Sequence, residues 1–61
     1  MKQISRHEAE ALVYSSQVIS SDVEQDHEEM RIYFTLDDRS VFILKYDLQN
    51  HKKRYFIKEI I

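Results

Sequence analysis

The chain has 61 residues, of which 43% are hydrophobic and 33% charged, and its formal net charge is −2. This composition is too apolar for intrinsic disorder. The small net charge gives no overall reason to expect a nucleic acid or an anionic membrane as the partner. Cysteine is absent, which excludes disulfides and thiolate metal sites. We therefore expect one small domain that spans residues 1–61.

A domain of this size buries only about 60% of the surface that its unfolded chain exposes, so association with another chain would stabilise it. The sequence begins with Met1 and soon reaches charged residues, so we expect a complete small protein without a signal peptide. Apolar runs such as Val41–Leu44 reach only four residues, far fewer than the ~20 residues needed to cross a bilayer. We expect a cytoplasmic protein.

The first predicted element is a helix from Arg6 to Ser16. Ser5 and Glu8 have the spacing of a capping box, in which the serine accepts from the amide of Glu8 and the glutamate reaches back. Apolar residues follow at helical spacing but form only a narrow stripe. This helix therefore needs a sheet to pack against.

Four strands are predicted after the helix. A half-buried strand begins at Val18 and ends at Glu24, and strict alternation from Met30 to Leu36 indicates a second strand with one buried face. The third strand covers Val41–Leu48, and a fourth covers Arg54–Ile61, although a helix is the rival interpretation there. Glycine and proline are absent, so the turns must use Asp, Asn and Ser and be longer than two residues.

The predicted fold is α+β, with one N-terminal helix packed on a three- to four-stranded antiparallel meander (α-β-β-β-β). A three-residue loop at 37–39 would place Phe34 opposite Phe42 and turn the even-numbered residues towards the helix. A four-residue loop would reverse the facing, so the register stays open at this stage.

Motifs for catalysis or metal binding are not convincing. The zinc helix motif begins at His7-Glu8, but Ala11 stands where the second histidine is required. The cluster from Asp26 to Glu29 contains possible ligands, but consecutive residues cannot converge on one cation, and a solvated turn is the better interpretation. Five of the six serines have structural explanations; Ser40 is the one that we expect to be exposed, and no histidine is predicted near it. We therefore expect no enzyme, no cofactor, no metal and no small-molecule substrate.

The charges are unevenly distributed along the chain. Seven acidic residues and no Lys or Arg lie between Glu8 and Glu29, whereas four basic residues and no acid lie between Asn50 and Lys58. The basic residues adjoin two aromatics, a combination found in single-strand nucleic-acid sites. The candidate residues for this alternative are Lys52, Lys53, Arg54, Tyr55 and Phe56. A basic hairpin that deters edge-to-edge aggregation is the competing interpretation.

The first functional hypothesis is a non-enzymatic protein-interaction or regulatory module. If the even-numbered residues face the helix, Tyr33, Val41 and Ile43 lie together on the other side of the sheet, with Tyr55 or Phe56 beside them. An apolar patch that contains tyrosine often marks a protein contact, with another protein or with a second copy in a homodimer. Alternatively, the stems of long neighbouring side chains cover the patch; these neighbours are Arg31, Lys45 and Lys58.

Overall fold

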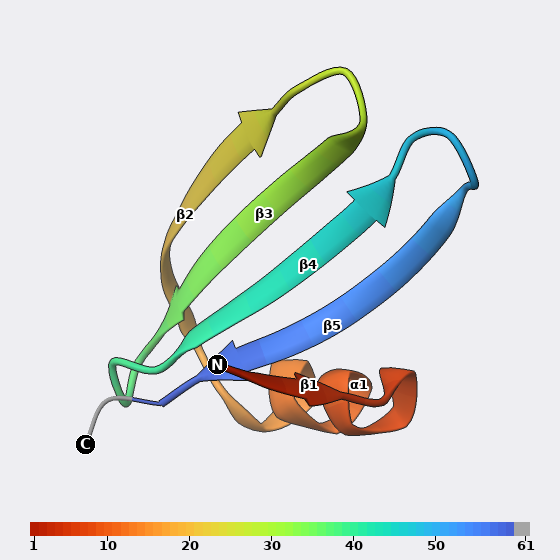
Figure 1. The fold of residues 1–61 in the computed structure, drawn as a ribbon. Coiled ribbons are helices and arrows are strands. Elements are labelled where there is room, and N and C mark those ends of the chain that lie inside the picture. The colour runs from red at the N-terminus through yellow and green to blue at the C-terminus, as the bar shows by residue number, and fades with distance from the viewer. Residues whose placement is uncertain (60–61) are drawn as a thin grey trace.

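The structure is a computed structural model that describes residues 1–59. In this part of the chain one helix and five strands follow one another (Figure 1), with the bounds β1 Lys2–Ile4, α1 Arg6–Ser15, β2 Val18–Gln25, β3 Glu29–Leu36, β4 Val41–Asp47 and β5 Lys52–Lys58. The strands form one antiparallel sheet in the order β1-β5-β4-β3-β2. The predicted α+β class and the four-stranded meander are confirmed. Within residues 1–59 no helix is long and apolar enough to cross a membrane.

Strand β1 is the element that the sequence analysis does not predict. Its three residues pair with β5 at the outer edge of the sheet, and Ile4 lies opposite Tyr55. Three residues are too few for a periodic pattern, so tertiary pairing alone defines this strand. At the other end of the chain, the predicted last strand includes Ile60 and Ile61, which lie outside the described residues.

The helix begins where the capping signal predicts. The Ser5 hydroxyl oxygen accepts a hydrogen bond from the Glu8 amide at 3.1 Å. In return, the Glu8 carboxylate accepts from the Ser5 hydroxyl at 3.3 Å and not from the Ser5 amide. Ala9 is buried and belongs to one cluster with Ile4 and Leu12, so the narrow helical stripe packs on the sheet as expected.

The register of the β3–β4 hairpin follows the three-residue loop. Phe34 lies opposite Phe42, and Ile57 lies opposite Phe42 on the next strand. Paired residues in an antiparallel sheet point to the same face, so this row faces one side together. Leu36, Phe42 and Ile57 are buried in one cluster with Ala9 of the helix. The even-numbered side chains of β3 and β4 therefore face the helix, as predicted.

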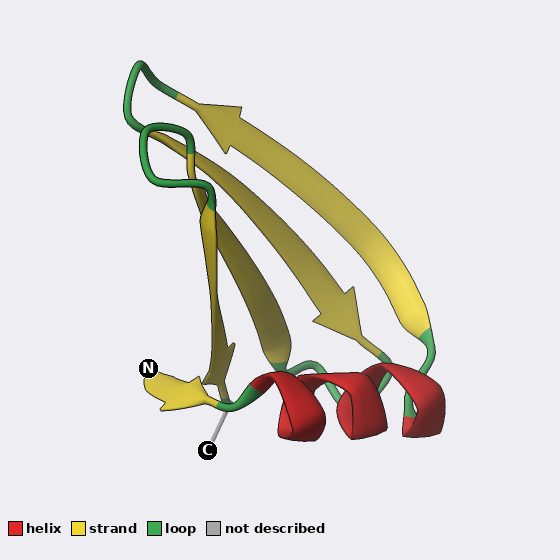
Figure 2. Ribbon diagram, turned by 90° about the vertical axis from the view of Figure 1, so that its right-hand side faces the viewer, coloured by secondary structure: helices red, strands yellow, loops and turns green. Residues whose placement is uncertain are grey.

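The helix lies across one end of the sheet and not along it. Figure 2 shows the strands rising well beyond the helix, which lies at one end of the sheet. An α-helix is about 10 Å wide, whereas an eight-residue strand is about 26 Å long. The helix therefore covers only a few residues of each strand that it crosses. Strand β2 is exposed along its whole length, so the prediction that it is half-buried is wrong.

Each of the three meander hairpins contains an aspartate that accepts hydrogen bonds from its own turn. Asp26 accepts from two backbone amides at 2.9 and 2.8 Å, and Asp47 accepts from two at 2.9 and 3.1 Å. Asp38 accepts from the backbone amide and the hydroxyl of Ser40. Since the chain lacks glycine, the left-handed backbone positions are occupied by Arg39 (φ 71°) and His51 (φ 55°).

Candidate functional site

The patch predicted from the sequence lies on the sheet face opposite the helix, which we call the charged face. Ile43 pairs with Tyr33 on one side and with Phe56 on the other. Tyr33, Val41 and Phe56 are half-buried, and Ile43 is only 4% exposed. Tyr55 projects from the helix-side face instead, because neighbouring residues of a strand point to opposite sides. The expectation of an open patch is therefore wrong at its central residue, Ile43.

Long charged side chains close this face. The Lys45 ammonium nitrogen lies 4.9 Å from the centroid of the Phe56 ring. Arg31 forms ion pairs with Asp26 at 3.2 Å and with Glu29 at 3.0 Å. These contacts raise the pKa of the Arg31 guanidinium above its ordinary value, so it stays charged. The alternative interpretation, in which long stems cover the patch, describes the structure at Arg31 and Lys45.

The acidic side chains of the charged face hold the cations in place. Glu29 contacts Arg54 at 3.2 Å as well as Arg31, so one carboxylate joins two strands of the sheet. Glu24 lies 3.7 Å from Arg31. The Glu24 carboxylate also raises the pKa of the Tyr33 phenol. The charged face is thus a network of opposite charges and not a basic surface.

The basic and aromatic residues of β5 do not share one surface. Alternation places Lys52, Arg54 and Phe56 on the charged face and Lys53 and Tyr55 on the helix side. Within the charged-face set, the guanidinium of Arg54 is bound to an acid and the ring of Phe56 lies beneath an ammonium group. The five residues of the nucleic-acid hypothesis are therefore divided between two faces.

The acidic turn uses its carboxylates internally. Hydrogen bonds from the backbone amides of Glu28 and Glu29 lower the pKa of Asp26. The second oxygen of Asp26 accepts from Arg31. Within residues 1–59, no group of three or more His, Asp or Glu side chains is arranged to hold a metal ion.

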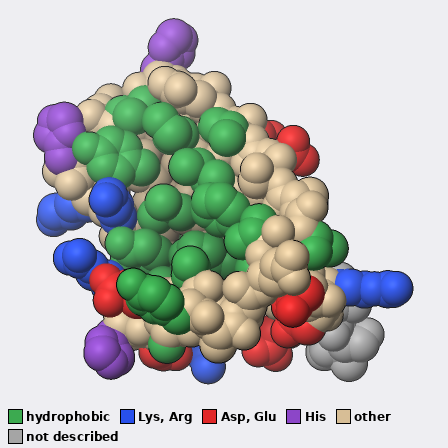
Figure 3. Space-filling view, turned by 180° about the vertical axis from the view of Figure 1, so that it is seen from behind, with side chains coloured by type: hydrophobic (Ala, Val, Ile, Leu, Met, Phe, Trp, Pro, Cys, Tyr) green, Lys and Arg blue, Asp and Glu red, His purple; other side chains and the backbone are tan. Residues whose placement is uncertain are grey.

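An uncovered apolar surface lies on the helix side, beyond the helix. We call it the open face, and it consists of Val23, Met30, Ile32, Leu44 and Tyr46. Pairing places these residues on the same side as the core, but they do not belong to the cluster that packs around the helix in the described part of the chain. Four of them are half-buried by their neighbours in the sheet, and Val23 is 62% exposed. Figure 3 shows hydrophobic side chains gathered across this face, with charged side chains at its margins.

An apolar groove joins the open face to the helix. It has a volume of about 390 Å³, and its lining includes Val13 and Tyr14 of the helix and Phe42 and Tyr55 of the sheet. The Phe42 ring stacks on Tyr55 with 6.2 Å between the ring centroids. The Tyr14 side chain is 92% exposed at the lip of this groove. The groove therefore offers aromatic surface with an adjacent exposed tyrosine.

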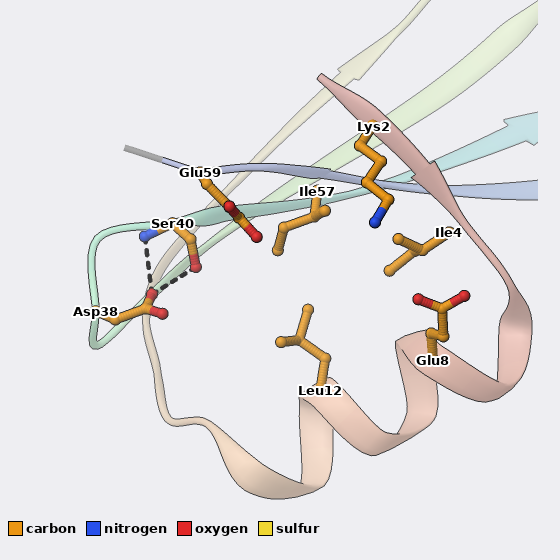
Figure 4. A pocket seen from close by; sticks show the side chains of 8 residues that line it. All are labelled: Lys2, Ile4, Glu8, Leu12, Asp38, Ser40, Ile57 and Glu59. Carbon is orange, nitrogen blue, oxygen red and sulfur yellow. Dashed lines mark hydrogen bonds between the residues drawn. The ribbon is translucent and has the colours of Figure 1, made fainter. Parts of the chain in front are cut away.

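A second, more polar pocket lies on the other flank of the helix. Figure 4 shows Leu12 and Ile57 facing each other across it, with Glu8 and Lys2 on one side and Asp38 on the other. Its volume is about 370 Å³. The Asp38 carboxylate is occupied by the backbone amide and hydroxyl of Ser40. The polar groups of Asp38 and Ser40 therefore already bind each other within the turn. The lining of this pocket is also less apolar than that of the groove.

The sequence contains a signal for the open face. The even-numbered residues of the second and third predicted strands are apolar along their whole length, and one slim helix cannot shelter them all. The sequence does not reveal that the helix would cross the strands at one end, which leaves the helix side open. The comparisons add no further information: the chain matches no protein-family model, no curated protein and no solved structure.

Proposed function

We propose that the protein is a non-enzymatic protein-interaction module that binds another protein through its open face. The observation that carries this proposal is the contrast between the two sides of one sheet. The charged face is closed by ion pairs at Arg31 and by Lys45 over Phe56. The open face, in contrast, consists of five uncharged side chains. None of them belongs to the cluster of described residues that packs around the helix.

The composition of the open face is suited to a protein contact. Methionine and tyrosine are enriched at the centres of protein interfaces, and the open face presents Met30 and Tyr46. Burial of apolar surface contributes roughly 25 cal/mol per Å². Half-buried side chains on a strand lose less conformational entropy on binding than the side chains of a flexible loop do. The Tyr46 hydroxyl lies 3.2 Å from His51 Nδ1, which fixes the ring at the rim.

The environment of Ser40 supports a non-catalytic role. The side chain is buried, and its hydroxyl donates to Asp38 within the same turn. These hydrogen bonds lower the pKa of Asp38. A carboxylate with a lowered pKa is a weak base, so this pair is poorly suited to activating a nucleophile. The pair is better explained as a hydrogen-bonded interaction that stabilises the β3–β4 turn.

The proposed partner is a protein that shares the compartment of this chain. We place the function in the cytoplasm, because disulfides are rare there and the chain has no cysteine. A second copy of the chain is one protein that could fill the open face. Sedimentation velocity from micromolar to millimolar concentration distinguishes such a homodimer from a monomeric chain that binds a different protein.

Site-specific photo-cross-linking in the native host tests the proposal. A photoreactive residue replaces Tyr46 on the open face, and in a matched control it replaces Lys58 on the charged face. We expect one discrete adduct from position 46 and none from position 58. The captured protein, once purified, should bind the wild-type chain and bind Leu44→Glu at least tenfold more weakly. Equal cross-linking from both positions, or binding that Leu44→Glu leaves unchanged, would contradict the proposal.

A further inference from the structure

Besides the open face, the structure of residues 1–59 leaves the outer edge of β2 without a partner strand. The sheet order places β2 at one end, and all eight of its residues are exposed. The opposite edge is formed by the three-residue β1. A long exposed edge strand presents a row of free backbone donors and acceptors, which makes it a template for another strand. A register shift between Val18 and Ser20 disrupts only the first part of the strand.

The backbone hydrogen bonds identify which groups face outward. The Asp26 amide donates to the Glu29 carbonyl at 3.0 Å, so this pair is a hydrogen-bonded pair of the β2–β3 ladder. Hydrogen-bonded pairs alternate along an antiparallel ladder, which makes Glu24 with Arg31 the next such pair. The intervening residues of β2 direct their amide and carbonyl groups away from β3. They are Ser21, Val23 and Gln25.

The adjacent β3–β4 ladder supports this assignment independently. The Leu36 amide donates to the Ser40 carbonyl and the Leu48 amide donates to the Glu28 carbonyl, both at 2.9 Å. Even-numbered residues of β3 therefore direct their backbone groups to β4, and odd-numbered ones direct them to β2. The outward groups of β2 are thus the odd-numbered ones.

The side chains of β2 divide into two chemically different rows. Val23 pairs with Ile32 and extends the open face, whereas Asp22 pairs with Tyr33 on the charged face. Glu24 is also on the charged face, and its side chain remains 59% exposed beside Arg31. Among the described residues Asp22 forms no ion pair. An added strand would therefore meet apolar surface on one side and, on the other, the unpaired carboxylate of Asp22 and the half-exposed carboxylate of Glu24.

These charges disfavour a second copy of β2 as the added strand in the registers centred on the part of the strand beyond Ser21. Two β2 strands related by a two-fold axis would bring their acidic rows onto the same face. A register centred on Asp22 places that residue opposite itself, and one centred on Val23 places it opposite Glu24. Like charges directly opposite each other destabilise a strand pair. A strand with basic residues in those positions would be stabilised by them instead.

We propose that the free edge of β2 receives an extended strand of another protein whose residues alternate between basic and apolar. The basic side chains lie beside Asp22 and Glu24, and the apolar ones lie beside Val23 and enlarge the open face. The outward backbone groups of Ser21, Val23 and Gln25 provide the hydrogen bonds, in the manner of strand addition at an exposed sheet edge. This inference rests on the proposed function and specifies the class of its partner.

A nuclear magnetic resonance titration with synthetic heptapeptides tests the inference. The probe alternates lysine with valine, and the controls alternate glutamate with valine or carry N-methyl groups on every second residue of the lysine peptide. We expect the lysine peptide to shift the amide signals of Ser21, Val23 and Gln25 and to slow their hydrogen exchange. Neither control should do so, because one reverses the charges and the other removes the hydrogen bonds.

Matched charge variants show whether the acidic row contributes. Asp22→Asn combined with Glu24→Gln should weaken binding about tenfold at low salt, since both opposite-charge cross-strand pairs are lost. Glu10→Gln combined with Asp37→Asn removes the same charge elsewhere and should leave the affinity within about twofold.

Three outcomes would overturn the inference. The first is absence of binding by the lysine peptide. The second is binding that shifts only Met30, Ile32 and Leu44 and survives N-methylation, which would leave the docking function intact. The third is a β2 edge already protected in a dimer without peptide, which would identify a second copy as its occupant. Failure of the proposed function is separate, because it is measured by cross-linking at Tyr46.

Discussion

The Lys45 ammonium nitrogen lies over the ring of Phe56, 4.9 Å from its centroid. This contact joins β4 to β5 on the charged face, and Ile43 is buried in the row directly beside it. In residues 1–59 no cation–π contact and no ion pair lies over the open face. The two sides of one sheet therefore differ in how their apolar residues are protected from water.

Substitution of Lys45 separates the contribution of its charge from that of its stem. Lys45→Met keeps an apolar stem over Phe56 and removes the cation–π contact, so it should lower the free energy of unfolding by about 0.5–1 kcal/mol. Lys45→Ala also uncovers apolar surface and should cost more than Lys45→Met. Urea denaturation followed by circular dichroism measures both. Equal stability of Lys45→Ala and the wild type would show that Lys45 does not cover this face.

Two isoleucines on neighbouring strands test the difference between the faces. Ile43→Ala removes a buried side chain of the charged face and should destabilise the protein by about 2–5 kcal/mol. Ile32→Ala makes the same chemical change on the open face, where water already reaches the side chain, and should cost about 1 kcal/mol. The comparison uses denaturant midpoints of the two variants. An equal loss at the two positions would argue against an open face.

The three turn aspartates should lower the free energy of unfolding in acid. Hydrogen bonds in the turns, from the Asn50 side chain in the case of Asp47, lower the pKa of Asp26, Asp38 and Asp47 below the ordinary value of 3.8. A lowered folded pKa stabilises the folded state fully above 3.8. That contribution is lost as the pH falls from 3.8 through the lowered value. Free energies of unfolding measured from pH 6 to pH 2.5 should therefore decline at the acid end.

Asp47→Asn provides the matched control for this pH dependence. The amide cannot ionise, so the acid decline should be smaller in this variant than in the wild type. A decline of unchanged size would show that Asp47 does not contribute to it.

The left-handed position at Arg39 can be relieved by glycine. A residue with a Cβ atom pays roughly 1–2 kcal/mol in this conformation, and glycine loses about 0.5–1 kcal/mol more in conformational entropy. Arg39→Gly should therefore raise the free energy of unfolding by about 0.5–1 kcal/mol. Arg39→Ala keeps the Cβ atom and should not stabilise. Thermal melting distinguishes the two variants, and a gain in the alanine variant would point to the charge and not to the backbone.

The sequence was most informative where local chemistry determines structure. The spacing of Ser5 and Glu8 predicts the start of the helix. The three-residue loop at 37–39, one of the two loop lengths that the sequence left open, places Phe34 opposite Phe42. Both depend on residues close together in the chain. The turn positions with positive φ are harder to predict. The absence of glycine shows that other residues must adopt the left-handed conformation, but it does not show that these are Arg39 and His51.

The sequence was least informative where distant elements meet. Alternation places Tyr33 and Ile43 on one face, but it does not decide between an open patch and one that Arg31 and Lys45 close. The same alternation gives no crossing angle between helix and strands. The uncovered surface was therefore predicted on the wrong side of the sheet, because side-chain reach and helix orientation are tertiary properties.

The most direct test of the account is the accessibility of methyl groups to a neutral, soluble nitroxide, measured by nuclear magnetic resonance on a dilute sample that sediments as a monomer. The account predicts strong relaxation enhancement of the methyl signals of Val23, Ile32 and Leu44 and weak enhancement at Ile43. Protection of Ile32 and Leu44 as complete as that of Ile43 would contradict it, because the chain alone would then already cover the surface proposed for its partner.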